Sequence, residues 1–471
     1  MTDRKMRVET DSMGSIEVPA DRYWGAQTQR SLIHFSIGND RIPLEMIHSL
    51  ALVKKAAALA NLELGMLSSE KAGLVVQAAD EVISGKLDDH FPLHVWMTGS
   101  GSQSNMNVNE VIANRAIELC GGVKGSRDLI HPNDDVNKSQ SSNDVFPTAM
   151  HVTTARLFKD RLLPSVKCMR DELAEKGRSW DSIVKIGRTH LQDAVPLTLG
   201  QEFSGYAALL DDDIGRLEDA LEGIYEIAIG GTAVGTGLNA PAGFDTLVAQ
   251  KIRGMTSLPF IPAPNKFAVQ GSHNALAAAS AALKVLATSL YKIANDIRLL
   301  SCGPRAGLHE LIVPSYEPGS SIMPGKVNPT QCEAMAMVAV QVMAYDSAVS
   351  FANAGGYLEM NVYKPLMIFN IVQSAGMIAD SCDSFTRYLL KDLQPDRPRI
   401  DHFLKESLML VTALSPVIGY DKAAVLAHYA EEHHCSLQEA NAALSMVSAE
   451  DFDRIVDPAK MAYPHRRSPD A

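Results

Sequence analysis

Two long stretches of the sequence carry apolar residues at an unbroken alternation of three- and four-residue spacings. The first stretch consists of Leu276, Ala279, Leu283, Leu286, Leu290, Ile293, Ile297 and Leu300. The second lies within residues 201–230 and consists of two rows, Leu210, Leu217 and Ile224, and Ile214, Leu221 and Ala228. This spacing places apolar side chains on one face of a helix, and that face must be covered by other helices. The sequence therefore predicts a mainly α fold built around a long helical bundle.

A third stretch, residues 334–344, is apolar on every face except at Gln341. A helix without a polar face belongs at the centre of a bundle or between subunits. We therefore expect the protein to form oligomers.

The chain has 471 residues, which exceeds the size at which a single hydrophobic core stops growing. We expect a mostly helical N-terminal domain at 1–140, a central bundle domain at 141–368 and a small helical C-terminal domain at 369–471. Strands are expected only in a short hairpin around residues 7–18. The C-terminal tail at 465–471 is expected to be disordered.

Composition argues against several classes of partner. The formal net charge is −12 and no basic run is longer than Arg466-Arg467, which argues against binding of nucleic acid or an anionic membrane. The six cysteines show no C-x-x-C spacing, so neither a disulfide framework nor a metal site is predicted. The N-terminus lacks the apolar core of a signal peptide, and no uncharged stretch is long enough to cross a bilayer. We expect a cytoplasmic protein.

Four polar stretches interrupt the predicted helices: TGSGSQSN (98–105), SQSSND (139–144), GRTHLQD (187–193) and GSSIMPGKVNP (319–329). Short hydroxyl and amide side chains beside helix N-termini can bind carboxylates without burying many charges. The alternative is that these residues only cap helices, and each stretch alone favours that reading. Four such stretches together favour a binding site for a small dicarboxylate.

The stretch at 319–329 has the composition of a mobile catalytic loop. Its glycines permit unusual backbone conformations, and Pro324 and Pro329 separate it from the apolar helix that follows. His190 is expected just ahead of a helix, and Glu333 at the start of the helix after the loop. A carboxylate facing an imidazole would raise its pKa and orient it. The alternative is a hydrogen-bonded core histidine and an ordinary first-turn glutamate.

Nucleotide binding is not predicted. Five residues, and not four, separate Gly319 from Gly325, and Val327 stands where a phosphate-binding loop needs Ser or Thr. The glycines at 98–105 and 230–237 lack the strand–helix context of a dinucleotide site.

With these motifs the chain resembles the fumarase/aspartase superfamily, and within it the class II fumarases, from DSMGSIEVPADRYWGAQTQRS (11–31) to SLMLVTALSPVIGYDKAA (407–424). GSSxMPxKxNP is the superfamily signature. Members that release ammonia from aspartate usually have Ala where Gly325 stands. The resemblance implies the fumarase/aspartase-like fold and a cofactor-free, reversible trans addition of water to fumarate that gives L-malate. It also implies a homotetramer in which three subunits assemble each active site.

The resemblance also implies roles for individual residues. Ser320 would be the base that removes the proton at C3, and its alkoxide would be stabilised by Lys326. Lys326, Asn328 and Thr189 would bind the oxygens of the aci-carboxylate intermediate, and His190 paired with Glu333 would handle the water. The carboxylates of the substrate would be held by Ser100, Ser102, Ser141, Ser142 and Asn143. A second anion site would include His131, Asn133 and Asp134, although Asp128 stands where that site usually has a basic residue.

Several positions differ from the usual fumarase sequence. Ser102 replaces a common Thr, and Ala268, Asn274 and Tyr357 occupy positions where other residues are usual. Two alternatives stand beside this expectation, and only the first is motivated by these differences. The first is a hydratase or ammonia-lyase for a related dicarboxylate such as mesaconate or aspartate. The second is a non-catalytic helical scaffold.

Overall fold

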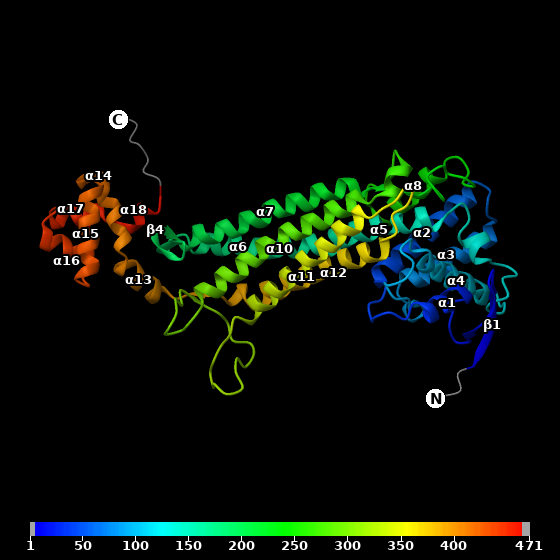
Figure 1. The fold of residues 1–471 in the computed structure, drawn as a ribbon, viewed down its shortest axis with the longest axis horizontal. Coiled ribbons are helices and arrows are strands. Elements are labelled where there is room, and N and C mark those ends of the chain that lie inside the picture. Colours follow the sequence, from blue (N-terminus) through cyan, green and yellow to red (C-terminus); the bar gives the residue numbers. More distant parts are fainter. Residues whose placement is uncertain (1–4, 464–471) are drawn as a thin grey trace. The chain divides into compact units, whose positions relative to one another are not determined.

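The computed structural model describes residues 5–463 and consists mainly of helices, with strands only in four short pairs within that range. The chain divides into two compact units. Unit 1 comprises residues up to 164, 213–287 and 338–379, and unit 2 comprises 165–212, 288–337 and the residues from 380 onward. Figure 1 labels the elements along the chain. The predicted mainly α fold is confirmed.

Unit 1 begins with an antiparallel hairpin in which Met6 pairs with Pro19, as the sequence predicts. Its elements are β1 (Met6–Asp11), β2 (Gly14–Pro19), α1 (Ala26–His34), α2 (Leu44–Glu63), α3 (Ser69–Ile83), η1 (Asp88–His90), α4 (Ser102–Leu119), η2 (Pro132–Val136), α5 (Ser142–Leu157), η3 (Phe158–Leu162), β5 (Glu226–Ile227), α8 (Phe244–Thr256), β6 (Ile261–Pro262) and α9 (Lys266–Gly271).

Unit 2 combines the ends of long helices with a group of short ones. Its elements are most of α6 (Leu163–Ser179), β3 (Val184–Thr189), β4 (Gln192–Thr198), β7 (Leu311–Ile312), η4 (Leu390–Asp392), β8 (Gln394–Pro395), α13 (Arg397–Glu406), η5 (Leu408–Leu414), α14 (Ser415–Ile418), α15 (Tyr420–Glu432), α16 (Leu437–Leu444), α17 (Ala449–Ile455) and α18 (Pro458–Met461). The short helices pack on an apolar core that includes Leu414, Leu426 and Phe452.

Four long helices contribute residues to both units: α7 (Leu199–Ile224), α10 (Asn274–Leu300), α11 (Thr330–Ala354) and α12 (Lys364–Tyr388). The heptad row predicts α10, and its members Leu276, Leu286 and Ile297 are fully buried. Within unit 1, Ser280 and Lys284 of α10 both bind the Asp346 carboxylate of α11, at 2.8 and 2.5 Å. The apolar row of α10 is therefore buried as predicted, and the polar residues beside it bind α11.

In unit 2, polar contacts also tie the long helices together. The hydroxyl of Tyr206 on α7 donates to Asp296 on α10 at 3.2 Å. The hydroxyl of Ser384 on α12 donates to Gln331 on α11 at 2.8 Å. These contacts fix the helices in register beside one another within the unit.

Three expectations need correction or stay open. The prediction that strands occur only near residues 7–18 is wrong, because β3 and β4 form a second antiparallel hairpin. Residues 334–344 do not lie at the centre of a bundle within this chain, because Met337 and Val340 of α11 are 69% and 56% exposed. The division at 140 and 368 is not tested by the two-unit grouping and stays a prediction. The tail at 465–471 lies outside the described residues.

Two helices among residues 5–463, α10 and α11, are long and apolar enough to cross a membrane by length and composition alone. Buried core helices of globular proteins meet the same criterion. The buried share of the apolar window is 56% for α10 and 28% for α11. All six cysteines are free thiols in the structure.

Candidate functional site

Three serine hydroxyls of unit 1 meet where α4 and α5 begin. The Oγ atoms of Ser102 and Ser142 lie 2.6 Å apart, and those of Ser100 and Ser102 lie 2.9 Å apart. We call Ser100, Ser102 and Ser142 the serine cluster. The structure thus joins two polar stretches that lie about 40 residues apart in the sequence.

Two glycines make this meeting possible. Gly101 has a φ of +80°, and a Cβ at this position would lie 2.3 Å from the ring of Phe146 on α5. A Cβ at Gly99 would lie 1.3 Å from the carbonyl oxygen of Val362. The loop before α4 can therefore approach both neighbouring segments only without side chains at these positions.

The other two candidates on α5 have structural partners. Ser141 caps α5, since its Oγ accepts from the N–H of Asn143 at 3.2 Å and its own N–H donates to Asp144 at 2.9 Å. The side-chain amide of Asn143 donates to the carbonyl of Ala233 at 2.8 Å. Ser141 therefore caps α5, and its predicted role in substrate binding stays a prediction, while the hydroxyl of Ser142 is directed at Ser102.

Behind the serine cluster lie buried charges that sequence reasoning missed. Asp144 is fully buried and accepts hydrogen bonds from the N–H groups of Gly230 and Thr232 at 2.9 and 3.0 Å. Lys54 and Lys364 are also fully buried. Burial lowers the pKa of Lys54 to about 7 and that of Lys364 to about 8, and the Asp144 carboxylate opposes both shifts. A lysine set among apolar residues, as in VYKPLMI (362–368), is the signal that could have revealed Lys364.

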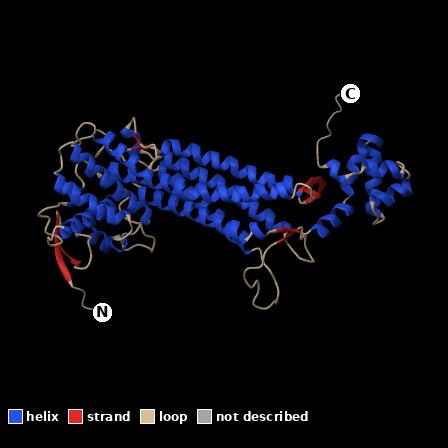
Figure 2. Ribbon diagram, turned by 180° about the vertical axis from the view of Figure 1, so that it is seen from behind, coloured by secondary structure: helices blue, strands red, loops and turns tan. Residues whose placement is uncertain are grey.

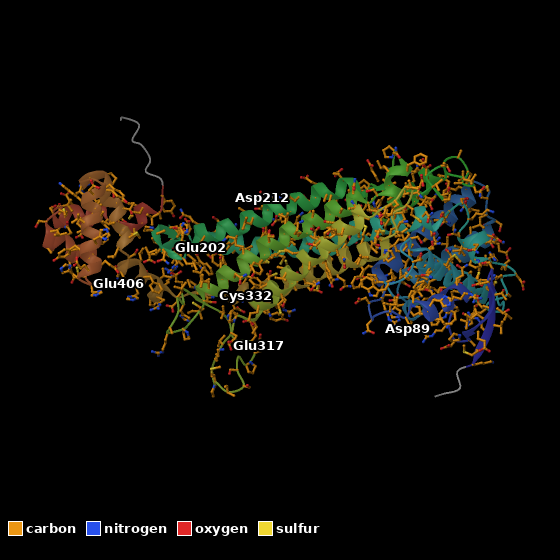
Figure 3. All side chains as sticks on the ribbon, viewed as in Figure 1. Asp89, Glu202, Asp212, Glu317, Cys332 and Glu406 are labelled. Atoms are coloured by element: carbon orange, nitrogen blue, oxygen red, sulfur yellow. The ribbon has the colours of Figure 1, made fainter. Side chains whose placement is uncertain are left out.

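The loop 319–329 belongs to unit 2 and is largely exposed, with Ile322 at 83%. Figure 2 shows the loop extending away from the ends of α10 and α11, and Figure 3 labels Glu317 and Cys332 near its two ends. The Oγ of Ser320 accepts hydrogen bonds from the N–H groups of Ile322 at 3.3 Å and Met323 at 3.0 Å. The oxygen of Ser320 is therefore held by backbone donors of its own loop.

Two further contacts close the loop on itself. The amide of Asn328 donates to the carbonyl of Gly319. A Cβ at Gly319 would lie 2.0 Å from the carbonyl oxygen of Lys326, so only glycine permits this approach. The signature residues Ser320, Lys326 and Asn328 are thus kept within one compact turn.

The expected position of His190 just ahead of a helix is wrong. His190 and Leu191 form the two-residue turn between β3 and β4, with φ values of 57° and 62°, and α7 begins only at Leu199. Positive φ at both central residues matches the right-handed twist of a tight hairpin, and this turn presents the imidazole at the tip. His190 lines a cavity of about 430 Å³ in unit 2. Thr189 is the last residue of β3.

The hairpin is anchored by a buried ion network that sequence reasoning also missed. The Glu310 carboxylate is fully buried and accepts hydrogen bonds from both terminal guanidinium nitrogens of Arg188, at 2.8 and 3.1 Å. Lys185, with a side chain 1% exposed, lies 3.0 Å from the same carboxylate and also reaches Glu202 at 3.1 Å. Figure 3 labels Glu202.

Glu333 lies in the first turn of α11 and is exposed. Within residues 5–463 of this single chain, no hydrogen bond or ion pair joins it to His190. Their pairing stays a prediction.

The residues of the predicted second anion site gather around a helix start. The Nδ1 atom of His131 accepts from the N–H groups of Asn133 and Asp134, both at 3.2 Å, and caps η2. The Asp134 carboxylate lies 3.4 Å from the same ring nitrogen. Arg127 donates to the carbonyl of Thr10.

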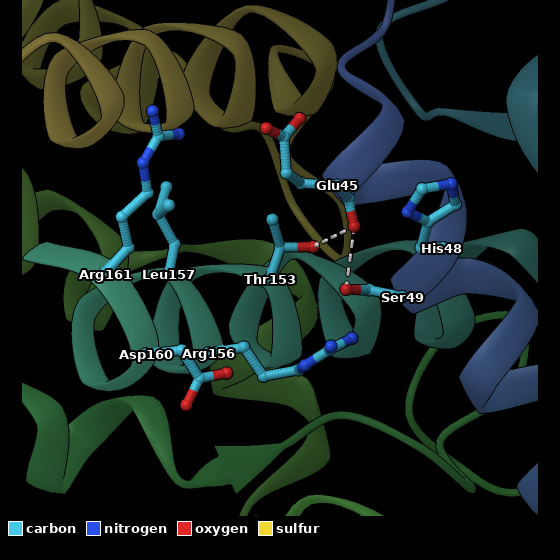
Figure 4. Close-up of a pocket in the computed structure, with 8 residues that line it drawn as sticks. All are labelled: Glu45, His48, Ser49, Thr153, Arg156, Leu157, Asp160 and Arg161. Atoms are coloured by element: carbon cyan, nitrogen blue, oxygen red, sulfur yellow. Dashed lines mark hydrogen bonds between the residues drawn. The ribbon is translucent and has the colours of Figure 1, made fainter. Parts of the chain in front are cut away.

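A smaller cavity of about 170 Å³ lies between α2 and α5 in unit 1. Figure 4 shows the hydroxyls of Ser49 and Thr153 both directed at the carbonyl of Glu45, with distances of 2.9 and 3.5 Å. None of the residues predicted for the site lines it.

Comparison with known proteins agrees with these features. A family model described as "Lyase" matches residues 14–344, and a second, described as "Fumarase C C-terminus", matches residues 410–463. The helical fold and the signature loop thus define a member of the lyase family that includes the fumarases.

Comparison with individual relatives identifies the family more narrowly. The class II fumarate hydratase of Methanosarcina acetivorans is 59% identical over 455 residues, which cover 97% of this chain and 94% of the relative. That of Thermosynechococcus vestitus is also 59% identical, over 96% of both chains. A crystal structure of class II fumarase from Schistosoma mansoni has a TM-score of 0.95 and 44% identity, covering 98% of this chain and 100% of that one. The chain belongs to the class II fumarate hydratase family, and the predicted fumarase/aspartase-like fold is confirmed.

Proposed function

We propose that this protein is a fumarate hydratase, which adds water reversibly and in trans to fumarate and gives L-malate. The observation that carries the proposal is the loop 319–329, in which the Oγ of Ser320 already accepts two backbone N–H groups. Family membership at 59% identity supports the same reaction.

In the direction from malate, Ser320 as an alkoxide removes the proton at C3. A serine hydroxyl is normally far too weak an acid to supply an alkoxide, so the negative charge must be stabilised by its surroundings. The N–H groups of Ile322 and Met323 point at this oxygen, and Lys326 supplies a positive charge on the same loop. Proton removal turns the adjacent carboxylate into an aci-carboxylate dianion.

The dianion then needs hydrogen-bond donors aimed at its oxygens. Lys326, Asn328 and Thr189 are the donors in this proposal. Hydroxide leaves C2 and departs as water with a proton delivered from His190, which Glu333 orients. The carboxylates of the substrate are bound by the serine cluster together with Ser141 and Asn143.

We further propose that the chain works as a homotetramer in which different subunits supply the serine cluster, the hairpin and the loop. The support is an exposed apolar face on α11, where Met337, Val340 and Phe351 are 69%, 56% and 80% exposed. Exposed apolar patches of this kind mark contacts between proteins. Cytoplasmic localisation is also part of the proposal.

Fumarate turnover tests the proposal. We expect the absorbance of fumarate to fall when wild-type protein is added, and we expect Ser320→Ala to be inert. Ser321→Ala is the matched control, because Ser321 is an exposed hydroxyl on the same loop. Activity retained by Ser320→Ala would refute the assignment of the base.

Positions 274 and 357 keep a related dicarboxylate as the second candidate substrate. Asn274 accepts from Ser272 at 2.9 Å and from Asn353 at 2.8 Å, and Tyr357 is 78% exposed. Ala268 lies on α9, whose N-cap Asn265 binds its N–H. Turnover of fumarate, mesaconate and aspartate, measured side by side, decides between the substrates.

A further inference from the structure

Unit 1 buries an excess of positive charge close to the serine cluster. Lys54 and Lys364 are fully buried, and the carboxylate that influences the pKa of both is Asp144. Lys266 also responds to Asp144 but has its own counter-ion, Asp245, at 3.5 Å. One buried carboxylate therefore serves two fully buried ammonium groups.

Of these two lysines, Lys364 lacks a partner. The Nζ of Lys54 donates to the amide oxygens of Asn137 and Gln140 at 2.8 and 3.0 Å. The Nζ of Lys364 makes no hydrogen bond within residues 5–463. A buried ammonium without an acceptor is costly, and such a group in a folded protein indicates a water, an ion or a ligand beside it.

One backbone hydrogen bond places Lys364 next to the loop that carries part of the serine cluster. Its N–H donates to the carbonyl of Gly99 at 3.1 Å, one residue before Ser100. Asp144, whose charge acts on Lys364, follows Ser142 by two residues on α5. The backbone of Lys364 is therefore bound to the loop that carries Ser100, and its ammonium group lies within electrostatic range of Asp144 on α5.

The neighbouring imidazole does not supply the missing acceptor. His273 is 2% exposed, and neither of its ring nitrogens has a hydrogen-bond partner within the described part of the chain. Burial lowers the pKa of His273 well below its usual value, and the charges of Lys364 and His151 lower it further. The imidazole beside Lys364 is therefore neutral and adds no negative charge, so Asp144, shared with Lys54, remains the carboxylate that acts on Lys364.

A carboxylate is the ligand that fits this arrangement. The cluster itself offers only neutral hydroxyls, and a desolvated carboxylate binds much more strongly to hydroxyls when a cation is close. The whole chain carries a net charge of −12, so its overall charge does not attract an anion. A buried lysine supplies the attraction locally.

We propose that Lys364 is a substrate-recognition residue whose buried ammonium pairs, directly or through one water, with the carboxylate that the serine cluster holds. The proposal rests on the proposed function and specifies one end of the site. The substrate completes the hydrogen bonding of Lys364 on binding. A ligand with a neutral group at this end leaves the ammonium unpaired and binds weakly.

Lys364→Met tests this, because it removes the charge and keeps an unbranched side chain that is only one heavy atom shorter. We expect the KM for fumarate to rise about 10- to 100-fold, as for loss of a hydrogen bond to a charged group, with kcat changing much less. Lys55→Met is the matched control, because Lys55 is on the same helix as Lys54 and pairs with the exposed Asp80. Its KM should equal that of the wild type.

A second measurement separates recognition from structural support. Succinate and its monoamide should compete with fumarate in the wild-type protein, with succinate the tighter inhibitor. Lys364→Met should lose most of this preference. A folded variant with an unchanged KM and an unchanged preference for succinate would overturn the role of Lys364.

Misfolding of the variant and inactivity of the wild-type protein are two separate outcomes. If circular dichroism shows that the variant does not fold, a structure of the wild-type protein with succinate decides. A carboxylate oxygen, or a carboxylate-bound water, within hydrogen-bond distance of Lys364 Nζ supports the proposal, and its absence overturns it. Wild-type protein without fumarate turnover counts against the proposed function, whereas normal wild-type turnover with an unaffected Lys364→Met counts against Lys364 alone.

Discussion

Replacement of Glu310 by Gln should loosen the hairpin that carries His190. Glu310 is fully buried and compensates two cations, Arg188 through two hydrogen bonds and Lys185 at 3.0 Å. Glutamine preserves the volume but removes the negative charge. The substitution therefore leaves a guanidinium in a low-dielectric site without its counter-ion.

The free-energy cost of Glu310→Gln depends on which of the two cations loses its counter-ion. Lys185 keeps Glu202 at 3.1 Å, so its charge remains compensated. Arg188, with a side chain 14% exposed, loses both hydrogen bonds to Glu310. It keeps its position over the ring of Phe403, 5.6 Å from the ring centre, and the weaker attraction of Asp193 and Glu202. Breaking a buried ion pair by removing one partner costs about 3–5 kcal/mol, and the retained Glu202 places this case near 3 kcal/mol.

Amide hydrogen exchange of β3 and β4 is the direct assay. A loss of about 3 kcal/mol corresponds to exchange roughly 100-fold faster for amides that open with the hairpin. Glu175→Gln is the control, because Glu175 and Arg178 form an exposed pair in the same unit, worth under about 1 kcal/mol. Unchanged protection of β3 and β4 in Glu310→Gln would refute the view that this network holds the hairpin.

Three further predictions concern the base, a buried histidine and the exposed face of α11. Ser320→Ala should lower kcat at least about 100-fold without changing the melting temperature, since Ser320 is a loop residue whose hydroxyl serves the reaction. Burial lowers the pKa of His151 to about 4 from 6.5, so its contribution to stability is complete above pH 6.5 and is lost as pH falls towards 4. The loss of folding free energy is about 3 kcal/mol. The melting temperature of His151→Gln, measured as a function of pH, should not show this loss. The raised pKa of Asp144 makes stability increase as pH falls, and it does so equally in both proteins. Met337→Lys should weaken assembly towards the 51.0 kDa single chain in analytical ultracentrifugation, whereas Tyr420→Lys, at an 80% exposed position elsewhere, should not.

Helices and the members of the serine cluster could be predicted because their signals are local. The heptad row from Leu276 to Leu300 covers the observed helix α10 almost completely. Ser102 and Ser142 were recognisable as polar residues beside helix starts, although only the fold places their hydroxyls 2.6 Å apart.

The hairpin at 184–198 could not be predicted from the sequence, for a physical reason. Its turn consists of His190 and Leu191, and neither is a residue that usually adopts positive φ. The Asn-Gly or Asp-Gly signal of a tight hairpin is therefore absent, and the pairing of β3 with β4 comes from tertiary contacts.

Buried charge is the second class of feature that local patterns do not reveal. Lys364 and Glu310 each depend on residues far away in the sequence, Asp144 in one case and Arg188 in the other. A lysine among apolar neighbours in the sequence predicts that the lysine is buried. It does not predict the counter-charge, because the fold brings that residue from a distant part of the sequence. The consequence differs between the two sites. Glu310 has two cations and is fully paired, which suits a structural anchor, whereas Lys364 lacks an acceptor within residues 5–463, which suits a group whose partner is the substrate.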